Sequence, residues 1–196
     1  MSDTTTDDSA SRLSGIKYNV HSCIQHLPVE KLKAASTKLC LPVHLMLFNL
    51  DGNMNVAMSI RSAAVLGCSD VWIVGRRKYD ARPEVGAKNY IRVHKVDAVS
   101  LEFFALNNLQ PFLIEQGGIP LEDMNFKPCI REPMTPCFIM GSEGHGLSQE
   151  FMKIMKPTAQ TLTISQYGLV RSLNVSIAAS IVIYEYLKQM RAASAV

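Results

Sequence analysis

The chain has 196 residues, of which 47% are hydrophobic and 19% are charged, and its formal net charge is +3 at pH 7. This length suits a single domain with its own core, and the small net charge does not by itself indicate a nucleic-acid partner. Five scattered cysteines lack the spacing of a zinc site, so we expect reduced thiols, a reducing compartment and no metal. Residues 1–15 are acidic and polar, which predicts a disordered tail and argues against a secretory or mitochondrial signal.

The first half of the chain predicts helices that alternate with buried strands. Residues 16–40 form a short N-terminal extension, in which we expect one helix over Val29–Ser36. The apolar run His44–Leu50 predicts a buried strand, and it ends at an Asp-Gly turn. Apolar residues then recur at helical spacing over Asn55–Leu66, and Asp70–Val74 predicts a second strand.

The second half continues this alternation and ends in an unusually apolar helix. After a loop-rich stretch, the sequence predicts a helix over Leu101–Gln116, a short strand over Ile119–Leu121 and a loop over 127–136. It then predicts a strand over Cys137–Met140, a helix over Ser148–Met155 capped by Ser148, and a strand over Thr161–Ser165. The last helix, with Ser172 as its expected N-cap, is apolar on almost every face. We therefore expect it to be covered on both sides, by the core and by a partner.

Several of the predicted strands are continuous apolar runs, and they alternate with helices. Both features indicate the α/β class, with a parallel sheet that carries helices on both faces. No internal repeat or linker is visible, so we assign residues 41–196 to one domain. Three loops follow predicted elements at the side of the sheet where such folds bind ligands, namely Asn53–Arg61, Gly141–Gly146 and Ser165–Asn174.

Taken singly, none of these loops specifies a chemistry. The GSEGHG loop matches neither a dinucleotide-binding nor a phosphate-binding pattern, and its carboxylate would repel a pyrophosphate. It also differs from the GxSxG turn of hydrolases. Arg61 alone would be an exposed surface arginine, and Asn174 alone would bond the start of a helix.

Taken together and in this order, the three motifs resemble those of a known enzyme family. NVAMSIRSAAVLG, IMGSEGHGLS and ISQYGLVRSLNVSIAAS resemble the motifs of the SpoU-type (TrmH-like) RNA 2′-O-ribose methyltransferases of the SPOUT superfamily. The resemblance runs from about His44 to Gln189. The third motif is most similar to the branch that methylates a guanosine ribose in the tRNA D-loop, although it reads Ile-Ser-Gln where the family usually has Ile-Pro-Met.

The resemblance implies a fold and a cofactor. Its members have a C-terminal trefoil knot, which periodicity cannot predict, and bind S-adenosylmethionine in it mainly through backbone groups. The positions implied here for cofactor binding are Gly141, Ile164 and Leu173, with Ser165, Gln166 and Gly168 alongside. A further cofactor contact is implied near Ile119–Leu121, where we name no residue.

The resemblance also implies a catalytic set, which consists of Arg61, Asn55, Glu143, Ser172 and Asn174. The implied reaction transfers a methyl group to a ribose 2′-hydroxyl by in-line displacement. Arginine keeps its proton at physiological pH, so we interpret Arg61 as orienting the hydroxyl or an RNA phosphate and stabilising the developing alkoxide, rather than as the base. Glu143 and Asn174 would position Arg61 for this role.

A basic stretch offers a site for RNA. Seven Lys and Arg residues lie between Arg76 and Lys95 against two acidic ones, with two tyrosines interleaved, and this suits phosphate contact and base stacking. The candidate RNA-binding residues are Arg76, Arg77, Lys78, Arg82 and Lys88. An ordinary solvated loop is an equal alternative.

We therefore predict an S-adenosylmethionine-dependent RNA 2′-O-methyltransferase acting on a tRNA guanosine. An rRNA substrate, a non-catalytic RNA-binding relative and a nucleotide-binding oxidoreductase remain alternatives, and the last lacks the expected glycine pattern after the first strand. The expected partners are RNA and a second copy of the chain bound through the C-terminal helix, without a membrane. The expected location is the cytoplasm, with the nucleus left open.

Overall fold

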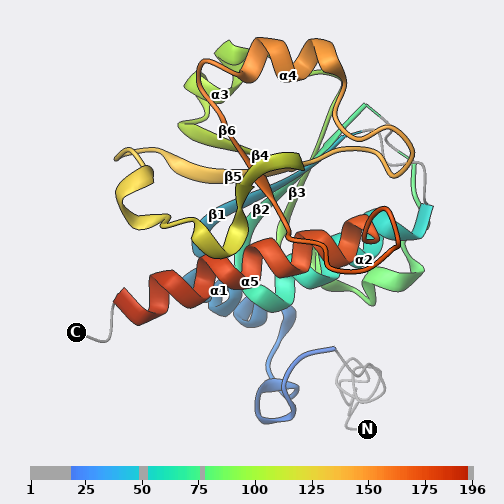
Figure 1. Ribbon diagram of the computed structural model, residues 1–196. Coiled ribbons are helices and arrows are strands. Elements are labelled where there is room, and N and C mark those ends of the chain that lie inside the picture. The colour runs from blue at the N-terminus through green and yellow to red at the C-terminus, as the bar shows by residue number, and fades with distance from the viewer. Residues whose placement is uncertain (1–18, 49–52, 76–77, 194–196) are drawn as a thin grey trace, which may run out of the picture.

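Six parallel strands form one sheet in the order β3-β2-β1-β5-β4-β6 in the computed structural model, which describes residues 19–48, 53–75 and 78–193 (Figure 1). The strands are β1 (Leu41–Phe48), β2 (Cys68–Val74), β3 (Arg92–Val96), β4 (Leu109–Pro120), β5 (Thr135–Met140) and β6 (Gln160–Thr163). The α-helices are α1 (Val29–Leu39), α2 (Asn53–Leu66), α3 (Leu101–Leu106), α4 (Gln149–Met155) and α5 (Val175–Ala193). The tail predicted over residues 1–15 lies outside the described residues.

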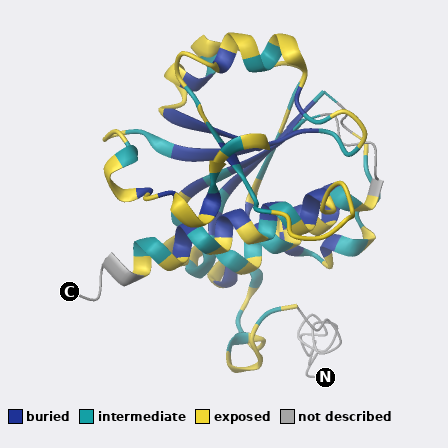
Figure 2. Ribbon diagram, viewed as in Figure 1, coloured by how far each residue is buried: buried dark blue, intermediate teal, exposed yellow. Residues whose placement is uncertain are grey.

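Helices pack on both faces of this sheet. Figure 1 shows α2 and α5 on one side and α3 and α4 on the other. Alternate strand residues supply the two cores: Leu45, Phe112 and Phe138 pack toward α2 and α5, whereas Met46 and Ile139 belong to the core under α3 and α4. The strands β2 and β5 are buried along most of their length, and β1 is buried at Val43 and over residues 45–47. Figure 2 shows this buried centre of the sheet. The predicted α/β architecture with a parallel sheet is confirmed.

Most of the predicted elements are present with bounds that shift by a few residues. The N-terminal helix, the helix after the first strand and the strands β1, β2 and β5 all occur where apolar spacing predicts them. Ser148 is the N-cap of α4, as predicted, because its Oγ accepts a hydrogen bond from the Phe151 amide at 3.1 Å.

One predicted helix is wrong. The stretch Leu101–Gln116 is the short helix α3 followed by the strand β4. Asn108 takes a left-handed conformation (φ 51°) and ends the helical path. The residues that follow are an apolar run that fits either element by periodicity, and pairing with β5 and β6 makes it a buried strand.

The predicted N-cap of α5 is also wrong. The helix begins at Val175, and its cap is Asn174, whose Oδ1 accepts from the Ser176 amide at 2.9 Å and from the Ser176 hydroxyl at 2.6 Å. Ser172 lies too far before the first turn for this role. Only one face of α5 is buried within the chain, as the alternating colours of this helix in Figure 2 show. Ile177 and Tyr184 of α5 are exposed. Among the described residues, no helix is long and apolar enough to cross a bilayer.

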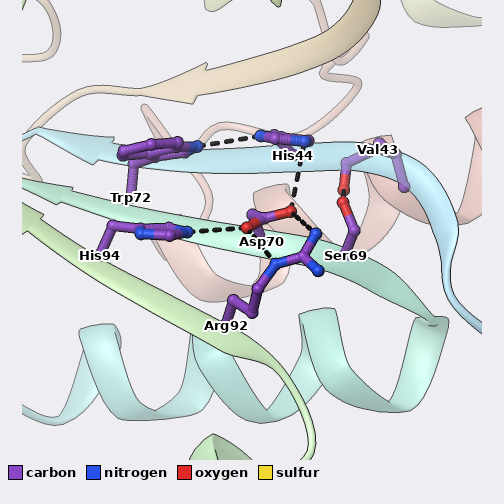
Figure 3. A network of polar contacts seen from close by, with 7 residues as sticks. All are labelled: Val43, His44, Ser69, Asp70, Trp72, Arg92 and His94. Atoms are coloured by element: carbon purple, nitrogen blue, oxygen red, sulfur yellow. Dashed lines mark hydrogen bonds and ion pairs between the residues drawn. The ribbon is translucent and has the colours of Figure 1, made fainter. Parts of the chain in front are cut away.

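A buried carboxylate links the three strands at one side of the sheet (Figure 3). Asp70 on β2 accepts from Arg92 on β3 through both carboxylate oxygens, at 2.8 and 2.7 Å. Its carboxylate also lies 2.7 Å from Nε2 of His94 and 3.3 Å from Nε2 of His44 on β1. Trp72 donates from Nε1 to Nδ1 of His44 at 3.0 Å and stacks on His94. The network therefore ties β1, β2 and β3 together.

This network makes folding sensitive to acid. Burial raises the pKa of the Asp70 carboxyl, but hydrogen bonds from Arg92 and His94 outweigh this and hold it below its ordinary value of 3.8. Burial also lowers the pKa of His44 from its ordinary value of 6.5. In both cases the unfolded chain binds more protons than the folded chain as the pH falls. The free energy of unfolding therefore decreases on acidification.

We predict that this loss occurs in two steps, the first below pH 6.5 from His44 and the second below pH 3.8 from Asp70. The variant Asp70→Asn should lose the second step, and its free energy of unfolding at neutral pH should fall by about 2 kcal/mol because Arg92 is left without its charged acceptor. Urea unfolding at several pH values measures both effects. The exposed Asp123→Asn is the control, and equal acid sensitivity in the two variants would contradict the assignment.

Candidate active site

The second and third motif loops meet at a cavity of about 360 Å³ beside the middle of β4 and the carboxyl ends of β5 and β6. Residues of these strands and of the start of α5 line it. Of the residues predicted from the sequence, six line this cavity, and they are Gly141, Glu143, Ile164, Gln166, Ser172 and Leu173. The second and third motifs, which are far apart in sequence, therefore share one site.

Glycine shapes the second motif loop. The Ser142 and Gly146 amides donate to each other's carbonyl oxygens at 3.1 and 2.9 Å, which closes a tight turn. A Cβ atom on Gly141 would overlap with the backbone of Gly146 and Leu147, and Gly146 itself takes a left-handed conformation (φ 65°). These glycines allow the backbone of the loop, rather than side chains, to form this wall of the cavity.

A chain of hydrogen bonds joins the three motifs. Asn55, in the first turns of α2, donates from Nδ2 to Oε1 of Glu143 at 2.5 Å. Asn174 donates from Nδ2 to Oδ1 of Asn55 at 3.1 Å, and its own Oδ1 caps α5. Both polar atoms of the Asn55 amide are therefore engaged, which orients its plane. The family resemblance placed Asn55, Glu143 and Asn174 in one catalytic set, and the structure joins their side chains by hydrogen bonds.

Other predicted residues lie outside this arrangement. Arg61 is exposed on α2 and makes no hydrogen bond or ion pair with another described residue. Ser165 and Gly168 belong to the third motif loop but do not line the cavity. The structure thus joins Asn55 to Glu143 and Asn174 by hydrogen bonds, and it shows none between Arg61 and these three residues. Across the described residues, no group of His, Cys, Asp and Glu is arranged to hold a metal ion.

Two residues that sequence reasoning missed also line the cavity, Glu115 and Gln116. They follow the buried part of β4, and the wrong helix prediction over this stretch hid them. The signal that could have revealed them is the pair Gly117-Gly118 after an apolar run, because glycine inside a strand often marks a bulge. Arg171, in the third motif, lines the cavity as well.

The basic stretch is partly neutralised within the chain. Arg82 pairs with Asp80 at 2.6 Å, and Lys88 pairs with the buried Glu84 at 3.0 Å. Lys78 is exposed. The predicted residues Arg76 and Arg77 lie outside the described residues. The stretch keeps cations available for a polyanion, but fewer than the sequence count suggests.

Comparison with known proteins identifies a family. The model of the SpoU rRNA Methylase family matches residues 42–184. The chain is 28% identical over 149 residues to the tRNA (guanosine(18)-2'-O)-methyltransferase of Borreliella burgdorferi, covering 72% of this chain and 64% of that protein. It is 27% identical over 143 residues to the enzyme of the same name from Escherichia coli K12, covering 69% and 58%. The chain thus spans about three fifths of the length of these relatives.

Solved structures show the same fold. The A. aeolicus TrmH/SpoU tRNA modifying enzyme matches with a TM-score of 0.69 and 18% identity, over 85% of this chain and 84% of that one. The SpoU methyltransferase AviRb from Streptomyces viridochromogenes, solved in complex with AdoMet, matches with a TM-score of 0.64 and 21% identity, over 79% and 62%. The family model covers most of the chain and all three motif loops of the site, and on that ground the chain belongs to the SpoU rRNA methylase family.

Proposed function

We propose that this protein transfers a methyl group from S-adenosylmethionine to a ribose 2′-hydroxyl of RNA, with a tRNA guanosine as the target. The observation that carries the proposal is the hydrogen-bonded chain Glu143–Asn55–Asn174 beside a small-molecule-sized cavity. Membership of the SpoU family supports it, and two relatives named as tRNA (guanosine(18)-2'-O)-methyltransferases favour tRNA over rRNA. Five free cysteines fit a reducing compartment, and we propose that the protein acts in the cytoplasm.

The residues around the cavity fit the cofactor. The glycine-shaped loop brings backbone groups close to the space, and Gly141, Ile164 and Leu173 would hold the cofactor there. When bound, S-adenosylmethionine supplies a methyl group on a positively charged sulfur. A wall made of backbone atoms binds such a molecule without a charged clamp, and Ser165, Gln166 and Gly168 would complete the loop around it.

We also propose that the C-terminal segment is threaded as a trefoil knot. β6 pairs with β4 at the edge of the sheet, yet the helix that follows it packs on α2 and on the face near β5. Residues 164–174 must therefore cross from the sheet edge back to the first and second motif loops. Such a crossing supports the knot that the family resemblance implies.

The chain's own residues can prepare the hydroxyl for attack. Arg61 carries a permanent charge on an exposed side chain, and we assign it to the substrate, where it would orient the hydroxyl or a neighbouring phosphate and stabilise the developing alkoxide. Glu143, Asn55 and Asn174 would hold the substrate side of the site, with Ser172 at its edge. The variant Arg61→Lys keeps the charge but loses the planar fork, so full activity in this variant would contradict the role.

Methyl transfer from radiolabelled S-adenosylmethionine to tRNA and rRNA transcripts tests the proposal directly. Label should enter tRNA, and mapping of 2′-O-methyl sites in total RNA with and without the protein should locate one guanosine. Label in rRNA alone would select the rRNA alternative. RNA binding without any label would select the non-catalytic relative.

We predict that the basic stretch contributes to RNA affinity. Replacing Arg76, Arg77 and Lys78 with alanine should make the dependence of log K on log salt shallower by about 2 to 3 units, because three phosphate contacts would no longer release counterions. Fluorescence anisotropy at several salt concentrations measures the slope. The control is the variant in which Lys127, Lys153 and Lys156 are replaced with alanine. An unchanged slope in the first variant would identify the stretch as an ordinary solvated loop.

We propose that two copies of the chain associate through α5. Its face away from the core exposes Ile177, Ile181 and Tyr184, with exposed fractions of 47%, 37% and 62%. These residues recur at helical spacing, so they form an apolar stripe along α5 that is exposed to water in a single chain. The apolar loop residues Leu169 and Val170 are also exposed. A second copy is the occupant that the family resemblance implies.

A further inference from the structure

The strand β4 contains a bulge next to the cavity. Ile114 and Ile119 both pair with Leu162 of β6, so the four residues between them are looped out of the ladder. Gly117 takes a left-handed conformation (φ 79°). A Cβ on Gly118 would lie 2.5 Å from the carbonyl group of Thr161, so only glycine allows the two strands to approach here. The bulge is therefore built into the sequence.

The bulge directs Glu115 onto the second motif loop. Its Oε2 accepts from the amide of Leu147 at 3.1 Å, and its Oε1 accepts from the amide of Gln116 at 3.0 Å. A Cβ on Gly146 would overlap with this carboxylate, which shows how closely the side chain packs on the loop. Leu147 is 5% exposed, so its amide has little access to water as an alternative partner.

The next residue reaches the third motif loop. Gln116 donates from Nε2 to the carbonyl oxygen of Arg171 at 2.9 Å, across 55 positions of sequence. A few residues later, hydrogen bonding from the Ser165 side chain is the largest cause that lowers the pKa of the exposed Glu122 carboxyl. Two adjacent residues, Glu115 and Gln116, therefore contact both loops that border the cavity.

We propose that Glu115 and Gln116 are positioning residues that hold the second and third motif loops at the spacing required to bind the cofactor. This inference rests on the proposed function, because it assigns the cavity to S-adenosylmethionine. Without Glu115 the Leu147 amide loses its acceptor, and the loop keeps its own Ser142–Gly146 turn and the hydrogen bond from Asn55 to Glu143. Binding of the cofactor would then have to order the loop, and affinity falls by that cost.

The test uses two substitutions that keep side-chain size. Glu115→Gln leaves one acceptor oxygen for two amides, and Gln116→Glu removes the donor to Arg171. We expect each to raise the Kd for S-adenosylmethionine about 10-fold by calorimetry, and to raise KM for the cofactor while kcat at saturating cofactor changes less than about 3-fold. Glu150→Gln, exposed on α4, is the matched control and should change neither. Because Gln116 is exposed, its variant keeps the test available if Glu115→Gln fails to fold.

A second readout does not depend on the cofactor. In the cofactor-free protein, hydrogen exchange of the Leu147 amide should be about 10-fold faster in Glu115→Gln than in the wild type or in Glu150→Gln. Unchanged exchange and an unchanged Kd would overturn the inference. If the wild type does not bind S-adenosylmethionine, the proposed function fails. The exchange rate then still decides whether Glu115 holds the loop, and unchanged exchange overturns that role.

Discussion

Replacing Asn174 with alanine is expected to reduce methyl transfer by about 100-fold, the cost of removing one positioned hydrogen-bond donor from an active site. Asn174 donates to Asn55, which in turn donates to Glu143, so the substitution breaks the link among the three motif loops. The same substitution removes the N-cap of α5 and should lower the free energy of unfolding by about 1 kcal/mol. Single-turnover kinetics and urea unfolding measure the two effects separately.

Asn174→Asp separates the two roles of this side chain. Aspartate can still accept from the Ser176 amide and cap α5, but it cannot donate to Asn55 and brings a second carboxylate toward Glu143. We expect the stability of this variant to stay within about 0.5 kcal/mol of the wild type, while methyl transfer falls as far as in Asn174→Ala. Activity close to the wild type in Asn174→Asp would show that the hydrogen-bonded chain serves folding and not the reaction.

Placing a glutamate at Ile181 is expected to convert a dimer into a monomer. Ile181 lies in the middle of the exposed apolar stripe of α5, and in a dimer the new carboxylate would be buried without a partner. We expect the dimer Kd to rise by at least about 100-fold, which corresponds to about 2.7 kcal/mol. Sedimentation velocity over a range of protein concentrations measures this shift, and circular dichroism checks that the helix remains.

The control for this experiment is Glu150→Lys, which changes a charge on α4, on the opposite face of the sheet (Figure 1). This variant should stay dimeric at concentrations where Ile181→Glu is a monomer. A wild-type protein that is monomeric at micromolar concentration would contradict the proposed interface. The exposed stripe on α5 would then need another explanation.

The sequence by itself determined the elements whose signals are local. The apolar runs of β1, β2 and β5 are long enough to identify buried strands, and the helical spacing in α2 and the Ser148 cap of α4 act within a few residues. The three motifs are also short stretches of sequence, and the family resemblance follows from the order of these motifs along the chain. For this reason the α/β class was predictable, and the family resemblance named six residues that line the cavity.

Only the tertiary structure decided the features that depend on distant segments. The apolar run at the start of β4 is a strand because β5 and β6 flank it, and neither neighbour is visible in its local sequence. Asn174 donates to Asn55, which lies 119 positions away in the sequence. Glu115 contacts Leu147 only because a bulge turns its side chain toward that loop. Periodicity and propensity act over a few residues, whereas these contacts depend on how the whole sheet packs, so no local pattern could have specified them.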